Sequence, residues 1–333
     1  MQAIVYRGNG SPDVLRCEEI EKPTPAQDEV LMKVHAASVN PLDWRMMRGG
    51  PLVSLLSLGR KPKLSHPGVD LAGVVEAVGG DVKRFKPGDE VFGAGRGAFA
   101  EYAYAPIRSL AIKPAAVSFE QAASLPVAGI TALQALRDHG HIQRDDKVLI
   151  NGASGGVGTF AVQIARHFGA EVTGVCSARN AELVRSLGAD RVIDYAQEDF
   201  TRSNERFDII LDNMGNHSLA ACRRVLSPRG RCVIIGGPKQ ISRILVHALG
   251  AMVMSWFVSQ KLGMMVAKVT SEDLNLLAEL VQSGRVTPAI DRRYSLRDVP
   301  EAVRYLETEH ARGKVVITVA EQSSTAENLR VSV

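Results

Sequence analysis

One stretch of the chain limits the possible folds more than any other. An apolar run, Lys147–Asn151, leads into the glycine-rich turn Gly152–Gly158 (GASGGVG), and the helical run Thr159–Phe168 follows at once. Strand, glycine turn and helix in this order form the first unit of a dinucleotide-binding fold. Glycine lets the backbone approach a pyrophosphate, whose charge meets the free N–H groups of the helix. Ala153 stands where the usual fingerprint has its first glycine, and a turn that only packs helix against sheet is the alternative.

The residues after this turn favour the cofactor interpretation. Apolar strands alternate with helices, and each predicted helix ends just before a glycine (Gly169 and Gly188), the usual C′ residue. Continuous apolar strands that alternate with helices predict a doubly wound parallel sheet in an α/β fold. The further predicted elements are the helix Ala181–Leu187 and the strands Glu171–Cys176, Arg191–Asp194, Phe207–Asp212 and Cys232–Gly236.

The two ends of the chain differ from this middle part. Short strand-like runs and turn formers fill the first third, and no helix of more than two turns is predicted before Ser118. The β-rich part therefore has two pieces, with the parallel sheet inserted between them. We predict a first domain at residues 1–122, a dinucleotide-binding domain at 123–262, a return to the first domain at 263–320, and a disordered tail at 321–333. The elements expected in the outer parts are strands at Ala3–Tyr6, Val14–Glu18, Glu29–Ala37, Val69–Val78 and Lys314–Val319, and helices at Ser118–Leu125, Gly129–His139, Ser271–Ser283 and Val299–Thr308.

The end of the second strand indicates which dinucleotide binds. An NAD site needs an acidic residue there, to accept a hydrogen bond from the ribose 2′-OH. The segment Val175–Asn180 holds no acid, but Ser177 can donate to a 2′-phosphate and Arg179 can pair with one. These residues predict NADPH, although Arg179 would also suit a solvated helix start.

Composition excludes several classes of protein. The net charge of +4 is spread over 333 residues without a block of five basic residues, which argues against a nucleic-acid partner. The longest apolar stretch, near Ala248–Val258, is too short to span a bilayer. Four cysteines at irregular spacing fit a reducing compartment, and no secretory signal is visible, so we expect a cytoplasmic protein.

Several ordered motifs together give a resemblance to the zinc-free quinone oxidoreductases of the medium-chain dehydrogenase/reductase family, including the reticulon-interacting mitochondrial branch. The resemblance covers residues 1–320 and implies a GroES-like barrel from both chain ends, a Rossmann domain between them, a homodimer, and a cleft where nicotinamide meets a small electrophilic substrate. The motifs are Asn40–Asp43, Pro67–Val75, Lys86–Val91, Gly129–Leu136, Gly152–Gly158, Leu187–Asp190, Phe207–Asp212 and Arg312–Val316.

The family pattern also assigns cofactor contacts. By position it implies Ser154, Gly155, Gly156 and Val157 on the pyrophosphate, Ser177, Arg179 and Tyr195 near the 2′-phosphate, and Asn40, Thr131, Asn213 and Gly236 toward the nicotinamide. Three of these have simpler explanations. Tyr195 suits an ordinary strand end, Thr131 can bond its own helix backbone, and Asn40 before Pro41 can shape a turn.

The resemblance further implies chemistry without a metal. Zinc-dependent relatives carry a Cys and a Gly-His-Glu run where this chain has Asn40 and Pro67-Gly68-Val69, and His66 alone cannot supply three protein ligands. We therefore expect hydride transfer to a quinone or an α,β-unsaturated carbonyl. We expect the walls of the acceptor site to include the 40–60 segment and Trp256-Phe257, although this apolar dipeptide would also suit a core or dimer contact.

The proton donor stays open at this stage. Arg45 stands where some quinone reductases have a Tyr, so Asn40, Asp43 and Arg45 are only weak catalytic candidates. A metal-free alcohol dehydrogenase and a non-catalytic NADPH-binding protein are the alternative functions.

Overall fold

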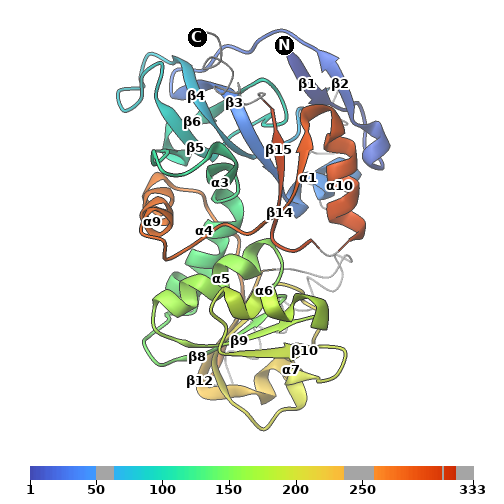
Figure 1. The fold of residues 1–333 in the computed structure, drawn as a ribbon, viewed down its shortest axis with the longest axis vertical. Coiled ribbons are helices and arrows are strands. Elements are labelled where there is room, and N and C mark those ends of the chain that lie inside the picture. The colour runs from blue at the N-terminus through green and yellow to red at the C-terminus, as the bar shows by residue number, and fades with distance from the viewer. Residues whose placement is uncertain (50–63, 236–258, 310, 320–333) are drawn as a thin grey trace, which may run out of the picture.

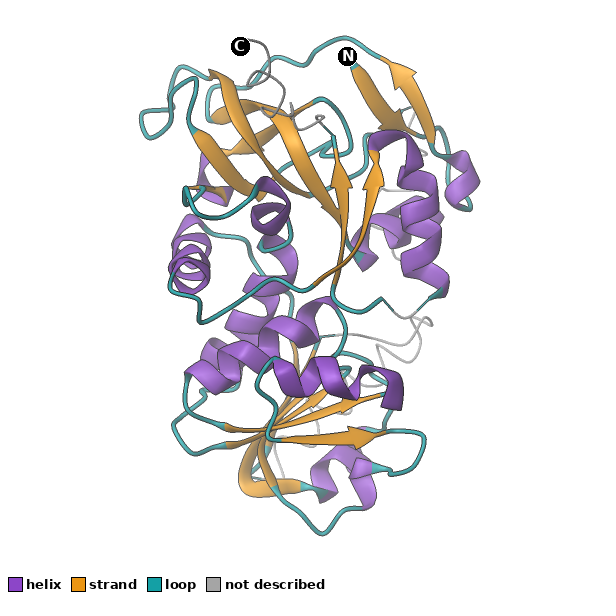
Figure 2. Ribbon diagram, in the orientation of Figure 1, coloured by secondary structure: helices purple, strands orange, loops and turns teal. Residues whose placement is uncertain are grey.

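The computed structural model describes residues 1–49, 64–235, 259–309 and 311–319, and its two large sheets lie toward opposite ends of the molecule (Figure 1). The upper sheet combines strands from both chain ends, and the lower sheet is formed by the middle of the chain (Figure 2). The predicted tail at 321–333, the predicted strand end at Gly236 and the dipeptide Trp256-Phe257 lie outside the described residues.

The upper sheet has seven described strands in the order β14-β15-β3-β4-β5-β7, with β6 paired to β3. Strand β15 pairs antiparallel with β3, placing Val316 opposite Ser38, so the end of the chain completes the sheet begun near its start. A separate pair, β1 (Gln2–Val5) and β2 (Arg16–Glu19), lies beside it. The strand bounds are β3 Glu29–Val39, β4 Asp70–Val78, β5 Glu90–Ala94, β6 Tyr102–Pro106, β7 Leu110–Ile112, β14 Ile290–Ser295 and β15 Lys314–Thr318.

The lower sheet has six described strands, all parallel, in the order β10-β9-β8-β11-β12-β13. In chain order this is 3-2-1-4-5-6, the arrangement of the dinucleotide-binding fold. Side chains on both faces of β8 are buried, as expected where helices cover both sides of a parallel sheet. The bounds are β8 Lys147–Asn151, β9 Glu171–Cys176, β10 Arg191–Asp194, β11 Phe207–Asp212, β12 Leu226–Ile234, β13 Lys261–Met264, with helices α5 Gly156–His167, α6 Ala181–Ser186 and α7 Leu219–Arg224.

Helix α4 (Pro126–Gln134) connects the two halves. It packs against α5 of the lower half and α9 (Ser271–Gln282), and it continues into a short π-helical turn, Ala135–His139. The other described helices are α1 (Pro41–Arg48), α3 (Phe119–Ala123), α10 (Val299–Thr308) and the short 3₁₀ turns Pro12–Val14, Ile107–Ser109, Ala178–Asn180, Phe200–Arg202 and Leu296–Asp298.

The predicted fold class is confirmed, with local differences. Helix α1 has eight residues, slightly more than the two turns allowed for this region, because Pro41 fits its first position and the Asp43 carboxylate accepts the Asn40 backbone N–H at 2.7 Å. Strands β6, β7, β13 and β14 were not predicted. Of these, β14 is mostly polar (IDRRYS), and an edge strand needs no continuous apolar run. The predicted C′ glycines are confirmed, with φ of +83° at Gly169 and +107° at Gly188.

Candidate active site

A cleft of about 470 Å³ lies where the glycine-rich turn meets the upper sheet. Its floor comes from the carboxyl ends of β8 and β9, and its opposite wall comes from Asn40, Pro41 and the start of β15. The backbones of the two halves touch here, because Gly155 and Gly313 form an isolated parallel bridge. Ligands of doubly wound folds bind at this edge of the sheet, so the cleft is the candidate cofactor site.

The glycines of the turn have different structural roles. Gly152 has φ of +81°, which favours glycine. A Cβ on Gly158 would lie 2.1 Å from the Gly152 carbonyl oxygen, so this glycine permits close packing of helix on strand. A Cβ on Gly155 or Gly156 would meet nothing closer than 3.3 Å, and both residues line the cleft. The first contact of the Gly156 Cβ would be Cδ of Lys314.

The start of α5 suits an anion. Gly155 is the N-cap, the first turn carries no acidic residue, and the first N–H groups of a helix have no intrahelical partner. Two buried amide oxygens near the cleft have no partner among the described residues. They are Oδ1 of Asn180, whose Nδ2 donates to Ser154 Oγ at 3.0 Å, and Oδ1 of Asn213, whose Nδ2 donates to the Asn151 carbonyl at 3.0 Å. Buried acceptors without donors indicate that a ligand with hydroxyl or amide donors completes the site. These groups fit a dinucleotide.

The residues predicted to recognise the 2′-phosphate are only partly brought together. Ser177 and Tyr195 line the cleft, and Tyr195 is 58% exposed. Arg179 lies in the same short turn but is exposed and does not line the cleft.

On the opposite wall, three buried side chains form a polar cluster, Asn40, Asp70 and Lys314. The Lys314 ammonium donates to Asn40 Oδ1 at 2.7 Å and to Asp70 Oδ2 at 3.3 Å, and Asn40 Nδ2 donates to Asp70 Oδ2 at 2.9 Å. Asp70 also accepts from the Ser38 hydroxyl at 2.9 Å and the Val127 backbone N–H, at the start of α4, at 3.0 Å. Exposure is 3% for Lys314, 2% for Asn40 and 0% for Asp70.

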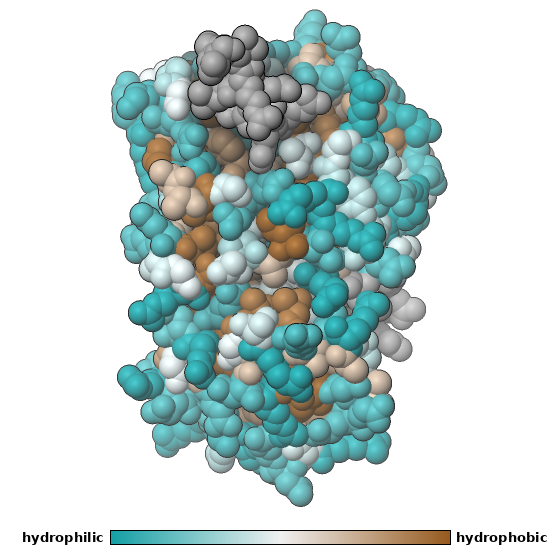
Figure 3. Space-filling view, viewed as in Figure 1, coloured by the Kyte–Doolittle hydropathy of each residue, from teal (hydrophilic) through white to brown (hydrophobic). Residues whose placement is uncertain are grey.

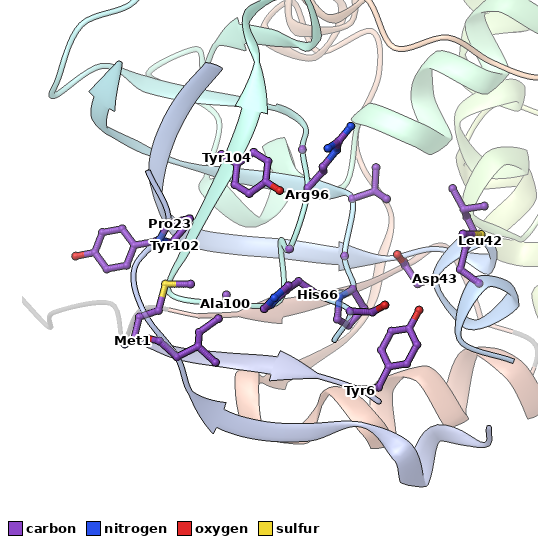
Figure 4. A pocket seen from close by; sticks show the side chains of 18 of the residues that line it. Met1, Tyr6, Pro23, Leu42, Asp43, His66, Arg96, Ala100, Tyr102 and Tyr104 are labelled. Carbon is purple, nitrogen blue, oxygen red and sulfur yellow. Dashed lines mark hydrogen bonds between the residues drawn. The ribbon is translucent and has the colours of Figure 1, made fainter. Parts of the chain in front are cut away.

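Asp43 lies behind Asn40 on the first turn of α1. Burial raises the pKa of its carboxyl from 3.8 to about 7, and the hydrogen bond from the Asn40 backbone opposes this effect only in part. Asp43 also lines a second cavity, a groove of about 610 Å³ on the upper half. Figure 4 shows Asp43, Tyr6 and His66 around this groove. Helix α1 separates the cavities, with Asn40 and Pro41 on the cleft and Leu42 on the groove.

The other predicted site residues have different surroundings. Thr131 is buried in α4, and its hydroxyl donates to the Val127 carbonyl at 2.6 Å, which is the simpler explanation given above. Arg45 is exposed on α1 over the Trp44 ring and lines neither cavity. Asn213 follows β11 beside the cleft, while Gly236 lies outside the described residues. Ser154, Gly155, Gly156 and Val157 all line the cleft.

Sequence reasoning missed Asp70, Lys314 and Asn180. The signal for the first two was present, since each is a charged residue at the first position of a strand, β4 or β15, and is followed directly by apolar residues. Such residues are rarely buried unless they are paired.

Neither a metal-binding cluster nor a membrane-spanning helix is found in the described part of the chain. No group of three His, Cys, Asp or Glu side chains is placed to hold a metal ion there. None of the described helices has the length and apolar character needed to cross a membrane. Hydrophilic side chains cover most of the face in Figure 3, in accord with the dispersed charge of the sequence.

Comparisons with known proteins agree with this architecture. Residues 26–115 match the alcohol dehydrogenase GroES-like domain, and residues 187–317 match the zinc-binding dehydrogenase model. The chain is 34% identical to the chloroplastic quinone-oxidoreductase QR1 of Triphysaria versicolor (95% of this chain, 98% of the relative). It is 37% identical to the human mitochondrial NAD(P)H oxidoreductase RTN4IP1 (88% and 82%), and 35% identical to 2-methylene-furan-3-one reductase of Solanum lycopersicum (95% and 79%).

A solved structure extends the likeness to the whole fold. The Escherichia coli quinone oxidoreductase complexed with NADPH superposes with a TM-score of 0.82 at 28% identity, covering 96% of this chain and all of that one. The upper half is thus a GroES-like domain and the lower half a Rossmann domain, and the protein is an oxidoreductase that binds NAD(P)H. The chain belongs to the quinone oxidoreductase-like family of medium-chain dehydrogenases/reductases.

Proposed function

We propose that the protein is a zinc-independent, NADPH-dependent reductase that delivers a hydride to a quinone or to the β-carbon of an α,β-unsaturated carbonyl. One observation carries the proposal: the cleft joins a glycine turn suited to a pyrophosphate with a buried polar cluster suited to a carbonyl oxygen. The relatives' names, a quinone oxidoreductase and a furanone reductase, support this choice of acceptors.

The residues that would hold NADPH follow the length of the cleft. The pyrophosphate would be held by Gly155, Gly156 and the first N–H groups of α5. The 2′-phosphate would be held by Ser177 and by Arg179, whose exposed side chain can rotate toward it. Asn180 offers an unpaired acceptor to a ribose hydroxyl. When bound, the reduced nicotinamide supplies the hydride.

The protein's contribution is positioning and exclusion of water. The polar cluster is almost completely buried, so an acceptor oxygen bound against it would lose its contact with water. Interactions with developing charge are stronger in such a site than in water. The groove beyond Leu42 offers space for the rest of the acceptor.

Zinc independence is supported by the chemistry of the residues present. Asn40 stands at a ligand position of zinc-dependent relatives, and its amide oxygen is occupied by the Lys314 ammonium at 2.7 Å. A fixed positive charge at this place disfavours a divalent cation by simple repulsion.

NADPH consumption by the purified protein tests the proposal, with a panel of quinones, enals, enones and enoyl thioesters as acceptors. We expect saturable turnover with at least one quinone or enone, and no turnover by Gly156→Val. Tight NADPH binding without any turnover would support a nucleotide-binding protein, and NADP⁺ reduction by simple alcohols would support an alcohol dehydrogenase.

We also propose a homodimer in the cytoplasm. Strand β13 is an edge of the parallel sheet among the described strands, and the nearby side chains of Met264 and Val266 are 36% and 95% exposed. Such an apolar edge suits a second copy of the chain. Light scattering should give twice the monomer mass. Cell fractionation should separate the protein from organelles, and this test is needed because relatives are named as mitochondrial or chloroplastic.

A further inference from the structure

Lys314 is a buried cation with one hydrogen to spare. Its ammonium has three N–H groups, and the two acceptors found for it in the described part of the chain are Asn40 Oδ1 and Asp70 Oδ2. Its stem passes beside Gly156, and the residue lines the cleft while being 3% exposed. The third N–H thus has no acceptor among the described residues, and the side chain that carries it lines the cleft.

The hydrogen bonds of Asp70 do not require this lysine. Asp70 already accepts from Ser38, Asn40 and the Val127 backbone at 2.9–3.0 Å, so both of its oxygens have donors without Lys314. The next three residues of β15, Val315, Val316 and Ile317, are apolar and fully buried. Because a buried ion pair is seldom more stabilising than apolar residues of the same volume, packing does not explain a lysine at this position.

The amide of Asn40 is bonded at both ends. Its Oδ1 accepts from Lys314 at 2.7 Å, and its Nδ2 donates to Asp70 at 2.9 Å and to the Ser38 carbonyl at 3.5 Å. Asn40 thus acts as a positioning residue that, with Asp70, fixes the direction of the ammonium.

We propose that Lys314 is a catalytic residue whose free N–H binds the acceptor's carbonyl oxygen and stabilises the negative charge that develops there. The proposal rests on the reductase function proposed above. In this role the fixed ammonium polarises the carbonyl, as a Lewis-acidic metal ion would.

An enone gains the hydride on its β-carbon, and a quinone gains it on one of its two oxygens. In both cases the conjugated π electrons move to the remaining carbonyl oxygen, and the cofactor is oxidised by two electrons. The resulting enolate or hydroquinone anion is stabilised by Lys314, which keeps its proton. A water molecule then protonates the anion and leaves hydroxide, so one proton is consumed per turnover.

Three variants test this role. Lys314→Met removes the ammonium, and Lys314→Met combined with Asp70→Asn removes both charges, so that no carboxylate is left uncompensated if the single variant fails to fold. Lys113→Met is the matched control, because Lys113 is also buried in the upper half but bonds the Val117 carbonyl at 2.7 Å and Glu90 at 2.9 Å, away from both cavities.

The measurements are kcat, the dissociation constant for NADPH and the melting temperature. We expect kcat of the folded Lys314 variants to fall on the order of 100-fold, the size found when one preorganised donor to an oxyanion is lost. The loss should be greater for an enone than for p-benzoquinone, because an enolate oxygen is more basic than a hydroquinone oxygen. NADPH affinity should change less than threefold, and Lys113→Met should keep the parent kcat.

Different failures have different meanings. An unmodified protein that turns over no acceptor would refute the reductase function itself. If it is active and the Lys314 variants keep its kcat, the role of Lys314 alone is overturned. A large loss of NADPH affinity with unchanged kcat would also overturn it, since the lysine would then contact the cofactor. An equal loss for enone and quinone would show a structural effect.

Discussion

Replacement of Asp43 by Asn should change how stability depends on pH. The pKa of the carboxyl is raised from 3.8 to about 7 by burial, so the folded state binds its proton more tightly than the unfolded chain does. The proton on Asp43 stabilises the folded state fully below pH 4, and this stabilisation is lost as the pH rises through 7. Between these values the free energy of unfolding falls by about 1.4 kcal/mol per pH unit, so the total loss is about 4 kcal/mol.

Asparagine keeps an oxygen for the Asn40 backbone N–H that Asp43 accepts at 2.7 Å, but it cannot ionise. Relative to Asp43→Asn, the unfolding free energy of the parent protein should therefore fall by about 1.4 kcal/mol per pH unit between pH 4 and 7. Above pH 8 the difference between the two proteins should no longer change. Urea unfolding at five pH values measures this difference. Asp89→Asn serves as control, because Asp89 accepts from the Lys86 backbone in an outer turn. A difference that stays flat from pH 4 to 8 would refute the reasoning.

Four further predictions concern the glycine turn, the cofactor and the metal. Gly158→Ala should destabilise the protein by about 1–3 kcal/mol, because its Cβ would lie 2.1 Å from backbone. Gly156→Val should melt near the parent temperature but gain nothing from NADPH; thermal melts with and without NADPH decide, and equal stabilisation of parent and variant would contradict us. Arg179→Ala should weaken NADPH binding about tenfold and leave NADH binding unchanged, by fluorescence titration. Exhaustive chelation should leave activity and melting temperature unchanged, and stoichiometric zinc by elemental analysis would contradict this.

The sequence predicts those parts of the fold that depend on neighbouring residues. Strands β8, β9, β10 and β11 were predicted with their observed bounds, because each is a largely apolar run bounded by turns or, before β9 and β10, by the C′ glycine of the preceding helix. Edge strands such as β14 were missed, since a strand with one partner and exposed side chains keeps no apolar pattern. Helix α1 was underestimated because its stability comes from a capping contact rather than from periodicity.

The same distinction applies to the site. The glycine turn is local, and Ser154–Val157 do line the cleft. The contact between Lys314 and Asn40 spans 274 residues and depends on the pairing of β15 with β3. A shift of one residue in that pairing would turn Lys314 to the other face of the sheet, and no sequence pattern fixes this register.

This pairing also links folding to function. Lys314 begins β15, its neighbour Gly313 bridges Gly155 of the glycine turn, and its ammonium contacts Asn40 beside α1. The glycine turn and the polar cluster are therefore held by two consecutive residues, Gly313 and Lys314. In the proposed reaction the hydride donor and the acceptor must meet at a fixed distance, and two adjacent residues provide a shorter connection between the halves than loops could. Because Lys314–Ile317 are buried in the upper sheet, this connection is anchored in its core.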